Sequence, residues 1–511
     1  MPRWGSLVIY FSLAICLLLG TYARFNNFEN RLLWWGDISR DLLVSNHMWQ
    51  YGERISIGHA ASGLHQGLCS IQNYPAYYYN YLSLLWSITQ SYIGVIEITA
   101  FVGILGVIFS YLLVSSLHNR CSGLIAAILF AVSQRFIENG RIIVGLQVSI
   151  SYVILGSFFV VHSLKKRIRW LNALGMVFLI FLSTFHYSIL VIVASFFVIS
   201  EVFFAERNLL RYVKNSFVMG IIYGIFFLLI HSSLIEACGG AVQFLSMFVG
   251  GNAGSQVQFR QGVPLLVTRH LEDLFPAYTF TTVYLIVACT VISLVLSKKS
   301  RVSIIGMLGM VILFLLASVG ATSQDIGMQA LQTLFIQYIL FFMSCISISF
   351  AWIESMKRKW YPLTFGVMVV FLVTLFSVSN KLAVLDGAPT NYSESELANS
   401  LLNQPLRPFT FTFYRSGMYD YDSVVIAFWL EQQSSQKIYK IINGFNNYTP
   451  IEQSPRYKFF LCDQYSYGFS SGECQKMFET FRNENKEYQE TPLQPFDFDR
   501  YDVRVLKKIV E

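Results

Sequence analysis

Long apolar runs separated by short polar stretches occupy the first three quarters of the chain. A helix needs about 20 apolar residues to cross a bilayer, and about eleven runs are candidates for such helices. These runs are residues 5–23, 91–117, 121–134, 142–164, 170–185, 187–204, 216–233, 275–297, 302–320, 331–353 and 361–380. The pattern therefore predicts a polytopic α-helical membrane protein with about eleven transmembrane helices.

The pattern changes after residue 380, where the chain becomes rich in Tyr, Ser, Asn, Gln and Asp. Strand-like runs fall at 409–414, 458–462 and 502–506. Helical runs fall at 393–402, 423–433 and 474–484. We therefore expect a transmembrane module at 1–380 and a small soluble α/β domain at 381–511.

Two of the loops between apolar runs are long. In the first, residues 24–90, the stretch 37–49 predicts a short helix at the membrane interface, with one stripe formed by Ile38, Leu42, Ser45 and Trp49. The second loop, residues 234–274, is dense in glycine, which predicts a mobile loop.

Composition supports the membrane class. The 511 residues are 54% hydrophobic and 13% charged, with a mean hydropathy of +0.50. Soluble proteins carry about 25% charged residues. The net charge of +7 does not indicate a nucleic-acid partner, because the basic residues gather in short clusters between the apolar runs.

These basic clusters also predict the orientation. Every second loop carries one of them, and cytoplasmic loops are the ones enriched in Lys and Arg. The clusters are Arg3, 118–120, 165–169, 207–214, 298–301 and 357–359. We expect a multi-pass protein of the plasma (bacterial inner) membrane, with a cytoplasmic N-terminus and an extracytoplasmic C-terminal domain. If that domain faces an oxidising compartment, Cys462 and Cys474 are a plausible disulfide; otherwise they remain thiols.

The densest polar chemistry lies in the first outer loop, directly after Trp34 and Trp35. At helical spacing, Asp37, Arg40 and Asp41 fall on one face. A carboxylate beside an aromatic pair at the membrane surface is a candidate general base for an incoming hydroxyl. The alternative is a helix cap at Asp37, with Arg40 and Asp41 as a surface ion pair.

The same loop continues with two histidines and an aromatic run. His59 and His65 lie six residues apart in a Gly-rich stretch, but no third metal ligand is within sequence reach. Tyr77 and Tyr78 belong to an aromatic run before the second apolar segment. That run is either an interfacial belt or a surface for sugar stacking or lipid chains.

A short outer turn carries two arginines on the side that the charge bias disfavours. Arg135 and Arg141 are therefore candidates for binding a phosphate, since guanidinium groups bind phosphate bidentately. Ion pairing with Glu138 is the alternative. Further polar candidates near the outer ends of the apolar runs are His186, Glu236 and Arg269.

Taken in order, these motifs resemble the GT-C superfamily of membrane glycosyltransferases. The likeness is to bacterial family 39 members that use a phospholipid-linked sugar, related to protein O-mannosyltransferases and the aminoarabinose transferase. It covers roughly residues 5–350 and rests on Gly36-Asp37-x-x-Arg40-Asp41, Gly58…Gly63…Gly67, Pro75-x-Tyr77-Tyr78, Ser133-Gln134…Gly140-Arg141 and Phe185-His186-Tyr187-Ser188.

The resemblance implies transfer of a sugar from a polyprenyl-phosphate carrier to a lipid, glycan or protein acceptor on the outer face of the bilayer. It implies Asp37 as the catalytic carboxylate, with Asp41 second. The donor phosphate would be held by Arg135, Arg141, Arg40 and Arg269. The substrate cavity would be lined by His59, His65, Tyr77, Tyr78, Glu138, His186 and Glu236. No cofactor is required; a divalent metal is compatible with this chemistry, and its ligands are unknown.

Two other classes share the multi-span pattern. A polysaccharide polymerase or ligase places its large outer loop late in the chain, whereas here a long loop follows the first apolar run. A transporter commonly shows paired halves and broken helices, which this sequence does not display. The glycosyltransferase interpretation therefore ranks first.

Overall fold

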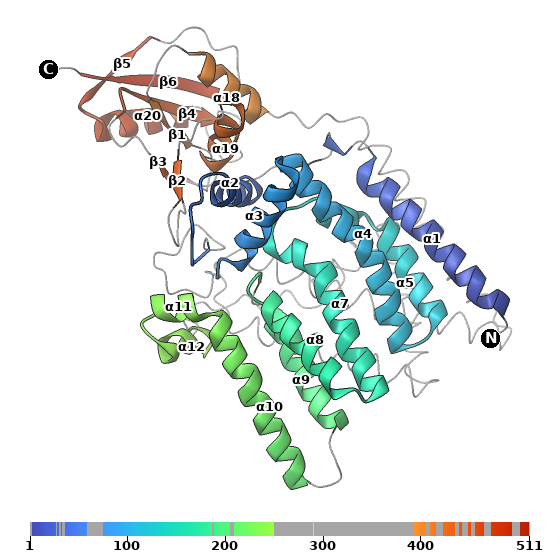
Figure 1. Cartoon of the computed structure of the whole chain (residues 1–511). Helices are drawn as coiled ribbons and strands as arrows, with labels where there is room; N and C mark the ends of the chain where they lie inside the picture. Colours follow the sequence, from blue (N-terminus) through green and yellow to red (C-terminus); the bar gives the residue numbers. More distant parts are fainter. Residues whose placement is uncertain are drawn as a thin grey trace. The chain divides into compact units, whose positions relative to one another are not determined.

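The computed structural model in Figure 1 comprises helices and a β-sheet that fall into two compact units. The first unit contains 1–32, 69–78 and 93–389, and the second contains 33–68, 79–92 and 390–511. The residues that the structure describes are 3–26, 28–29, 32, 36–58, 75–186, 189–204, 209–249, 290, 393–404, 409–414, 423–434, 439–441, 448–450, 455–463, 472–492 and 501–509.

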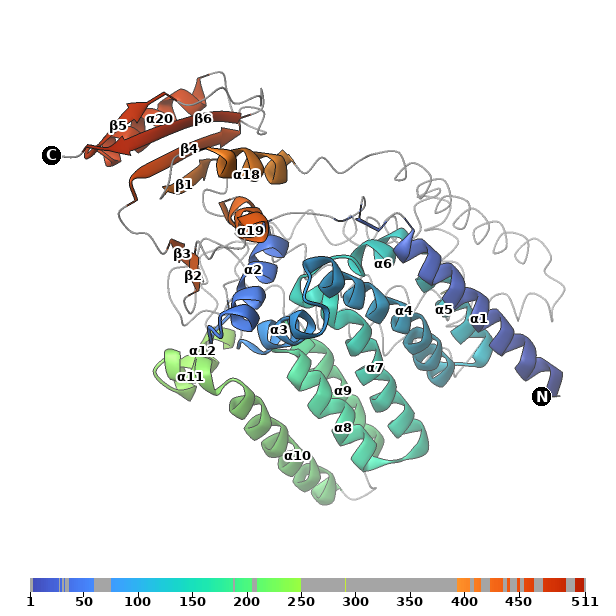
Figure 2. The same cartoon turned by 45° about the horizontal axis from the view of Figure 1, so that its top comes forward.

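The described part of the first unit is helical. Its elements are α1 (Arg3–Phe25), α4 (Tyr92–Leu117), α5 (Arg120–Val132), α6 (Gln134–Asn139), α7 (Gly145–Lys166), α8 (Arg169–Leu182), α9 (Ile189–Phe204), α10 (Leu209–Ile230), α11 (Ser232–Ala237) and α12 (Ala241–Val249). Helix α1 packs on α5, and α8 packs between α7 and α9, as both views show (Figures 1 and 2).

Three described helices are long and apolar enough to cross a membrane: Tyr92–Leu117, Gln147–Lys166 and Val213–Ile230. The shorter apolar helices are Ile9–Phe25, Arg120–Val132, Arg169–Leu182 and Ile192–Phe204. All seven coincide with apolar runs predicted from the sequence. The predicted runs from residue 275 to residue 380 lie outside the described residues, so the total of about eleven stays a prediction.

Two glycines allow α7 and α8 to approach closely. A Cβ atom on Gly156 would lie 2.8 Å from Cδ2 of Leu179, and one on Gly175 would lie 2.9 Å from Cγ2 of Val160. Small residues at helix contacts are typical of membrane helices, where packing rather than water exclusion drives association.

The second unit contains two helices from the first outer loop and the C-terminal elements. They are α2 (Gly36–Gln50), most of α3 (Tyr77–Thr89), α18 (Ser393–Asn403), β1 (Phe409–Tyr414), α19 (Ser423–Ser434), β2 (Tyr439–Ile441), β3 (Tyr448–Pro450), β4 (Tyr457–Asp463), α20 (Glu473–Glu484), β5 (Tyr488–Thr491) and β6 (Tyr501–Lys508). The predicted helices and strands of the C-terminal region are confirmed; the short strands β2, β3 and β5 were not predicted.

The sheet has the strand order β1-β4-β6-β5. Strand β1 pairs with β4 in parallel, and β6 pairs with both β4 and β5 in antiparallel fashion. Helix α20 packs against β4, where the Phe460 ring contacts the rings of Phe478 and Phe481. Alternation along β4 and helical periodicity along α20 bring these rings together.

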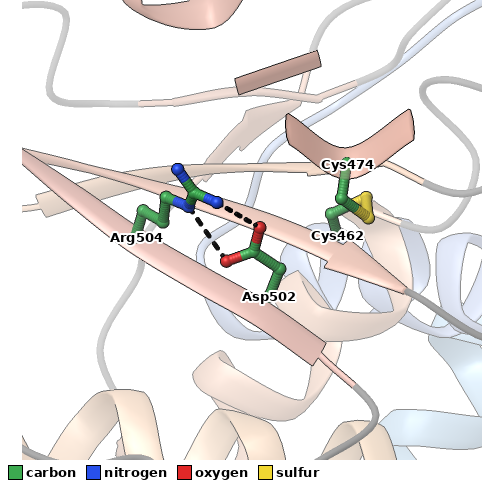
Figure 3. Close-up of a disulfide and its surroundings, with 4 residues drawn as sticks. All are labelled: Cys462, Cys474, Asp502 and Arg504. Atoms are coloured by element: carbon green, nitrogen blue, oxygen red, sulfur yellow. Dashed lines mark hydrogen bonds and ion pairs between the residues drawn. A yellow bond between two sulfur atoms is a disulfide. The ribbon is translucent and has the colours of Figure 1, made fainter. Parts of the chain in front are cut away.

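A disulfide joins Cys462 of β4 to Cys474 of α20, with a Cα–Cα distance of 5.8 Å (Figure 3). On the neighbouring strand β6, the Arg504 guanidinium forms a two-pronged ion pair with Asp502. Cys238 is also disulfide-bonded. The disulfide between Cys462 and Cys474, which the sequence left open, is therefore present.

One sequence prediction about the loops was wrong, and part of another stays a prediction. The predicted helix at 37–49 is confirmed as α2, and every residue from 38 to 47 is buried; its place at the membrane interface stays a prediction. The beginning of the second loop is not a mobile glycine-rich segment, because it forms α11 and α12. Gly239 and Gly240 make the turn between these two helices, at φ values of +77° and +135° that glycine adopts without strain.

Candidate active site

Helix α2 carries both predicted catalytic carboxylates. It begins at Gly36, so Asp37 lies in its first turn and Asp41 one turn later. Negative charge is favoured at a helix N-terminus, because the free N–H groups of the first turn point outward there. The position of Asp37 at this end of α2 thus suits an ionised carboxylate. The structure does not describe the Asp37 side chain.

Asp41 lies in a buried polar cluster with Arg40 and Tyr79. Its Oδ1 atom accepts from Arg40 Nε at 2.8 Å and from the Tyr79 hydroxyl at 2.8 Å, and Arg40 Nη2 lies 2.7 Å away. Burial raises the pKa of Tyr79 well above its ordinary value, against the lowering effect of the Arg40 charge. The predicted alternative of a surface pair is wrong, since Arg40 and Asp41 pair in the interior.

The contact between α2 and α3 extends beyond this cluster. Trp86 Nε1 donates to Ser45 Oγ at 3.0 Å, and Ser45 Oγ donates to the Asp41 carbonyl at 2.6 Å. The ring of Trp49 stacks on Trp86, with centroids 5.9 Å apart. Asp41, Ser45 and Trp49 are four residues apart, so one side of α2 is held against α3.

A second buried cluster was missed by the sequence analysis. His47 of α2 is fully buried, with Nδ1 lying 3.1 Å from Glu53 and Nε2 in a very short contact with Glu431 of α19. The two ends of this second contact are 384 residues apart in the chain. No local motif marks such a pair, which is why sequence reasoning passed over His47.

In the first unit, two buried arginines satisfy helix ends. Arg141 donates from Nε and Nη2 to the Arg24 carbonyl at 3.0 and 2.7 Å, and from Nη2 to the Ala23 carbonyl at 2.8 Å. Arg24 in turn donates to the carbonyls of Ala131, Phe130 and Phe136 at 3.2 to 3.3 Å. Each guanidinium thus caps backbone carbonyls at the C-terminal end of a neighbouring helix.

The predicted aromatic residues Tyr77 and Tyr78 contact rings at and just beyond the end of α8. The Tyr77 ring contacts Phe181, and the Tyr78 ring contacts Phe185 at a centroid distance of 5.4 Å. His186 follows Phe185 and is 3% exposed. Burial lowers the pKa of His186 to about 4, so this ring is neutral at physiological pH. Tyr77, Tyr78, Phe181 and Phe185 therefore form one aromatic cluster, and His186 is the next residue in the chain after Phe185.

The remaining predicted site residues are dispersed. Arg135 and Glu138 lie on α6, where the side chain of Arg135 is not described, and Glu236 is exposed on α11. His59, His65 and Arg269 lie outside the described residues. Within the residues described, no group of three or more His, Cys, Asp and Glu side chains is arranged to hold a metal ion.

No protein-family model matches the sequence, and no curated protein matches it. Solved structures do match. ArnT from Cupriavidus metallidurans is similar at a TM-score of 0.56, both bound to undecaprenyl phosphate and in the apo state. The sequence identities are 11% and 10%; the matches cover 99% of this chain and 98% and 99% of those chains. The chain has a GT-C membrane fold.

The Archaeoglobus fulgidus oligosaccharyltransferase, tethered with an acceptor peptide containing the NVT sequon, shares this GT-C fold at a TM-score of 0.51 and 12% identity. The match covers 84% of this chain and 63% of that chain, so this chain spans less than two thirds of the oligosaccharyltransferase. The predicted fold is confirmed, while membership of the superfamily and of family 39 stays a prediction.

Proposed function

We propose that this GT-C protein is a glycosyltransferase that moves a sugar from a polyprenyl-phosphate carrier to an acceptor on the outer face of the membrane. The observation that carries the proposal is α2: a buried helix, following the first apolar helix, with one carboxylate in its first turn and a second one turn later. Undecaprenyl phosphate bound to ArnT supports a lipid-linked donor, and the acceptor peptide tethered to the oligosaccharyltransferase supports a protein among the possible acceptors.

In the proposed reaction, the acceptor hydroxyl attacks the anomeric carbon of the donor sugar. A bond forms between the acceptor oxygen and that carbon, and the bond between that carbon and the phosphate oxygen breaks. The hydroxyl proton passes to Asp37, and the polyprenyl phosphate leaves with the electron pair. Asp41 is the weaker candidate for the base, because its Oδ1 atom already accepts from Arg40 and Tyr79.

The departing phosphate requires positive charge nearby. Of the four predicted arginines, Arg141 is bonded to α1 carbonyls and Arg40 to Asp41. Arg135 and Arg269 are therefore the first candidates for binding the donor phosphate. A divalent metal remains compatible with the chemistry, with His59 and His65 as its first candidate ligands.

The distribution of cysteines supports an extracytoplasmic C-terminal region. Disulfides form in oxidising compartments and are rare in the cytosol. Cys462 and Cys474 are bonded to each other, and Cys238 is disulfide-bonded after α10, in the predicted second outer loop. Cys121, beside the predicted cytoplasmic cluster 118–120, is a free thiol. This agrees with the orientation inferred from the basic loops.

The test uses the purified full chain in lipid nanodiscs with a panel of undecaprenyl-phosphate-linked hexoses and pentoses and a membrane extract as acceptor source. Release of undecaprenyl phosphate and sugar incorporation are measured together. Asp37→Asn keeps the side-chain size but cannot accept the proton, so transfer should fall by about 100- to 10,000-fold. Asp41→Asn should reduce it less, and the distant carboxylate variant Asp502→Asn is the matched control.

Several outcomes would contradict the proposal. Near-normal turnover in Asp37→Asn with an inactive Asp41→Asn would identify the other carboxylate as the base. Normal turnover in both would remove α2 from the chemistry. Substrate accumulation in vesicles without any sugar transfer would indicate a transporter instead.

A further inference from the structure

The buried stretch of α19 contains one charged residue. All seven residues from Val425 to Glu431 are buried, so this helix is enclosed on every side. The rings of Phe428 and Trp429 contact Tyr92, the first residue of α4, each at a centroid distance of 5.7 Å. Burying a carboxylate in such surroundings is costly unless a partner compensates for the lost water, so the position of Glu431 calls for a functional or structural reason.

The partner of Glu431 is His47 of α2, which belongs to the same unit. The His47 side chain is fully buried, and that of Glu431 is 2% exposed. The other ring nitrogen of His47 faces Glu53, just beyond the end of α2, at 3.1 Å. Each ring nitrogen of His47 therefore faces a carboxylate oxygen.

This contact lies on a side of α2 that α3 does not use. Ser45 faces α3 through Trp86, and two further residues along a helix turn the side chain by about 200°. His47 therefore projects to the opposite side, toward α19. Helix α2 is held on one side by α3 and on the other by Glu431. The rotation of α2 about its own axis depends on both contacts.

We propose that Glu431 is a positioning residue: it acts through His47 to hold α2 in the orientation that presents the catalytic carboxylate. The C-terminal region would then serve the transfer reaction from a distance, without touching substrate. This inference rests on the proposed function for the role of Asp37. The link between α19 and α2 can be measured independently of any activity.

The first measurement is hydrogen–deuterium exchange of the full chain. Glu431→Gln removes the charge but keeps the shape, and we expect faster exchange in residues 36–50, by about ten-fold, with unchanged exchange in α20. Glu431→Asp restores a carboxylate and should return α2 partly to the wild-type rate. Glu396→Gln, an exposed glutamate on the adjoining helix α18, is the matched control and should change nothing.

The second measurement is sugar transfer with the same donor panel. A slightly misplaced base lowers the rate of the chemical step, so kcat should fall by about 10- to 100-fold in Glu431→Gln, while KM for the lipid donor stays within about two-fold. His47→Gln also removes the contact with Glu53, so it should lower kcat at least as much. The double variant should be no worse than His47→Gln alone, because that variant already lacks the contact with Glu431.

The inference is overturned if exchange in α2 is unchanged in Glu431→Gln. It is equally overturned if exchange or thermal stability changes while kcat does not, because the bond would then be structural alone. If the wild-type protein transfers no sugar from any donor, the proposed function fails, and the exchange result alone decides whether α19 holds α2.

Discussion

Replacing Arg141 with alanine tests whether this arginine binds phosphate or caps a helix. As a phosphate ligand, Arg141 would matter for donor binding and little for folding. In the structure, it is 4% exposed and donates three hydrogen bonds to two carbonyls at the end of α1. Its guanidinium also lies over the Phe28 ring, at 5.8 Å from the centroid. We therefore expect Arg141→Ala to destabilise the helical unit.

The magnitude follows from the groups left behind. A hydrogen bond to a charged group contributes about 1.5–3 kcal/mol, and an unsatisfied buried carbonyl costs about 1–3 kcal/mol. Two carbonyls lose the Arg141 donors in this variant. Water that enters the space offsets part of this penalty, so the free energy of unfolding should fall by about 3–5 kcal/mol. That is a large share of the 5–15 kcal/mol that typically stabilises a folded domain.

The assay is thermal unfolding of the protein in nanodiscs, followed with and without added undecaprenyl phosphate. Arg141→Lys keeps the charge but loses the planar fork, so it should fall between wild type and Arg141→Ala. Arg135→Ala is the comparison, and it should weaken lipid binding without lowering the unfolding temperature. An Arg141→Ala protein that unfolds like wild type but no longer binds the lipid phosphate would refute the capping argument.

Three further predictions concern the disulfide, a buried histidine and the topology. Cys474→Ser breaks the bond between Cys462 and Cys474, which closes a loop with a sequence separation of 12. The free energy of unfolding, measured with denaturant on the full chain, should fall by about 3 kcal/mol. An equal effect of dithiothreitol on the wild type and on Cys474→Ser would contradict this. The pKa of His186 is about 4 in the folded protein, below its ordinary value of 6.5. Between pH 4 and pH 6.5, the unfolded chain therefore binds more protons than the folded protein. Stability should thus fall as pH drops from 6.5 to 4, by up to about 3 kcal/mol, and His186→Gln should flatten this dependence; an unchanged pH profile in that variant would exclude His186 as its cause. Reporter fusions after Arg169 should read cytoplasmic and fusions after Asn380 external; a cytoplasmic signal after Asn380 would rule out the odd number of spans.

The sequence alone was sufficient for the positions of the long apolar helices and of the strands β1, β4 and β6. The spans 91–117 and 187–204 coincide with α4 and α9 to within two residues at each end, because about 20 consecutive apolar residues have one stable arrangement in a bilayer. The strand at 409–414 was also found, because alternation along a half-buried strand is a local signal. The two glycines between α11 and α12 were noticed but misinterpreted, since glycine is as compatible with a tight turn between two helices as with a mobile loop.

Contacts between residues that are distant in the chain could be determined only from the tertiary structure. One stripe on α2 was read from the sequence, but the contacts of this helix with α3 and with α19 on different sides were not. Arg141 looked like a phosphate ligand because charge bias made it unusual, yet it is 117 residues from the α1 carbonyl that it binds. The same applies to His47 and Glu431. A side chain's chemistry is set by what lies against it, and when that neighbour comes from a remote segment, only packing of the whole chain determines which partner it meets.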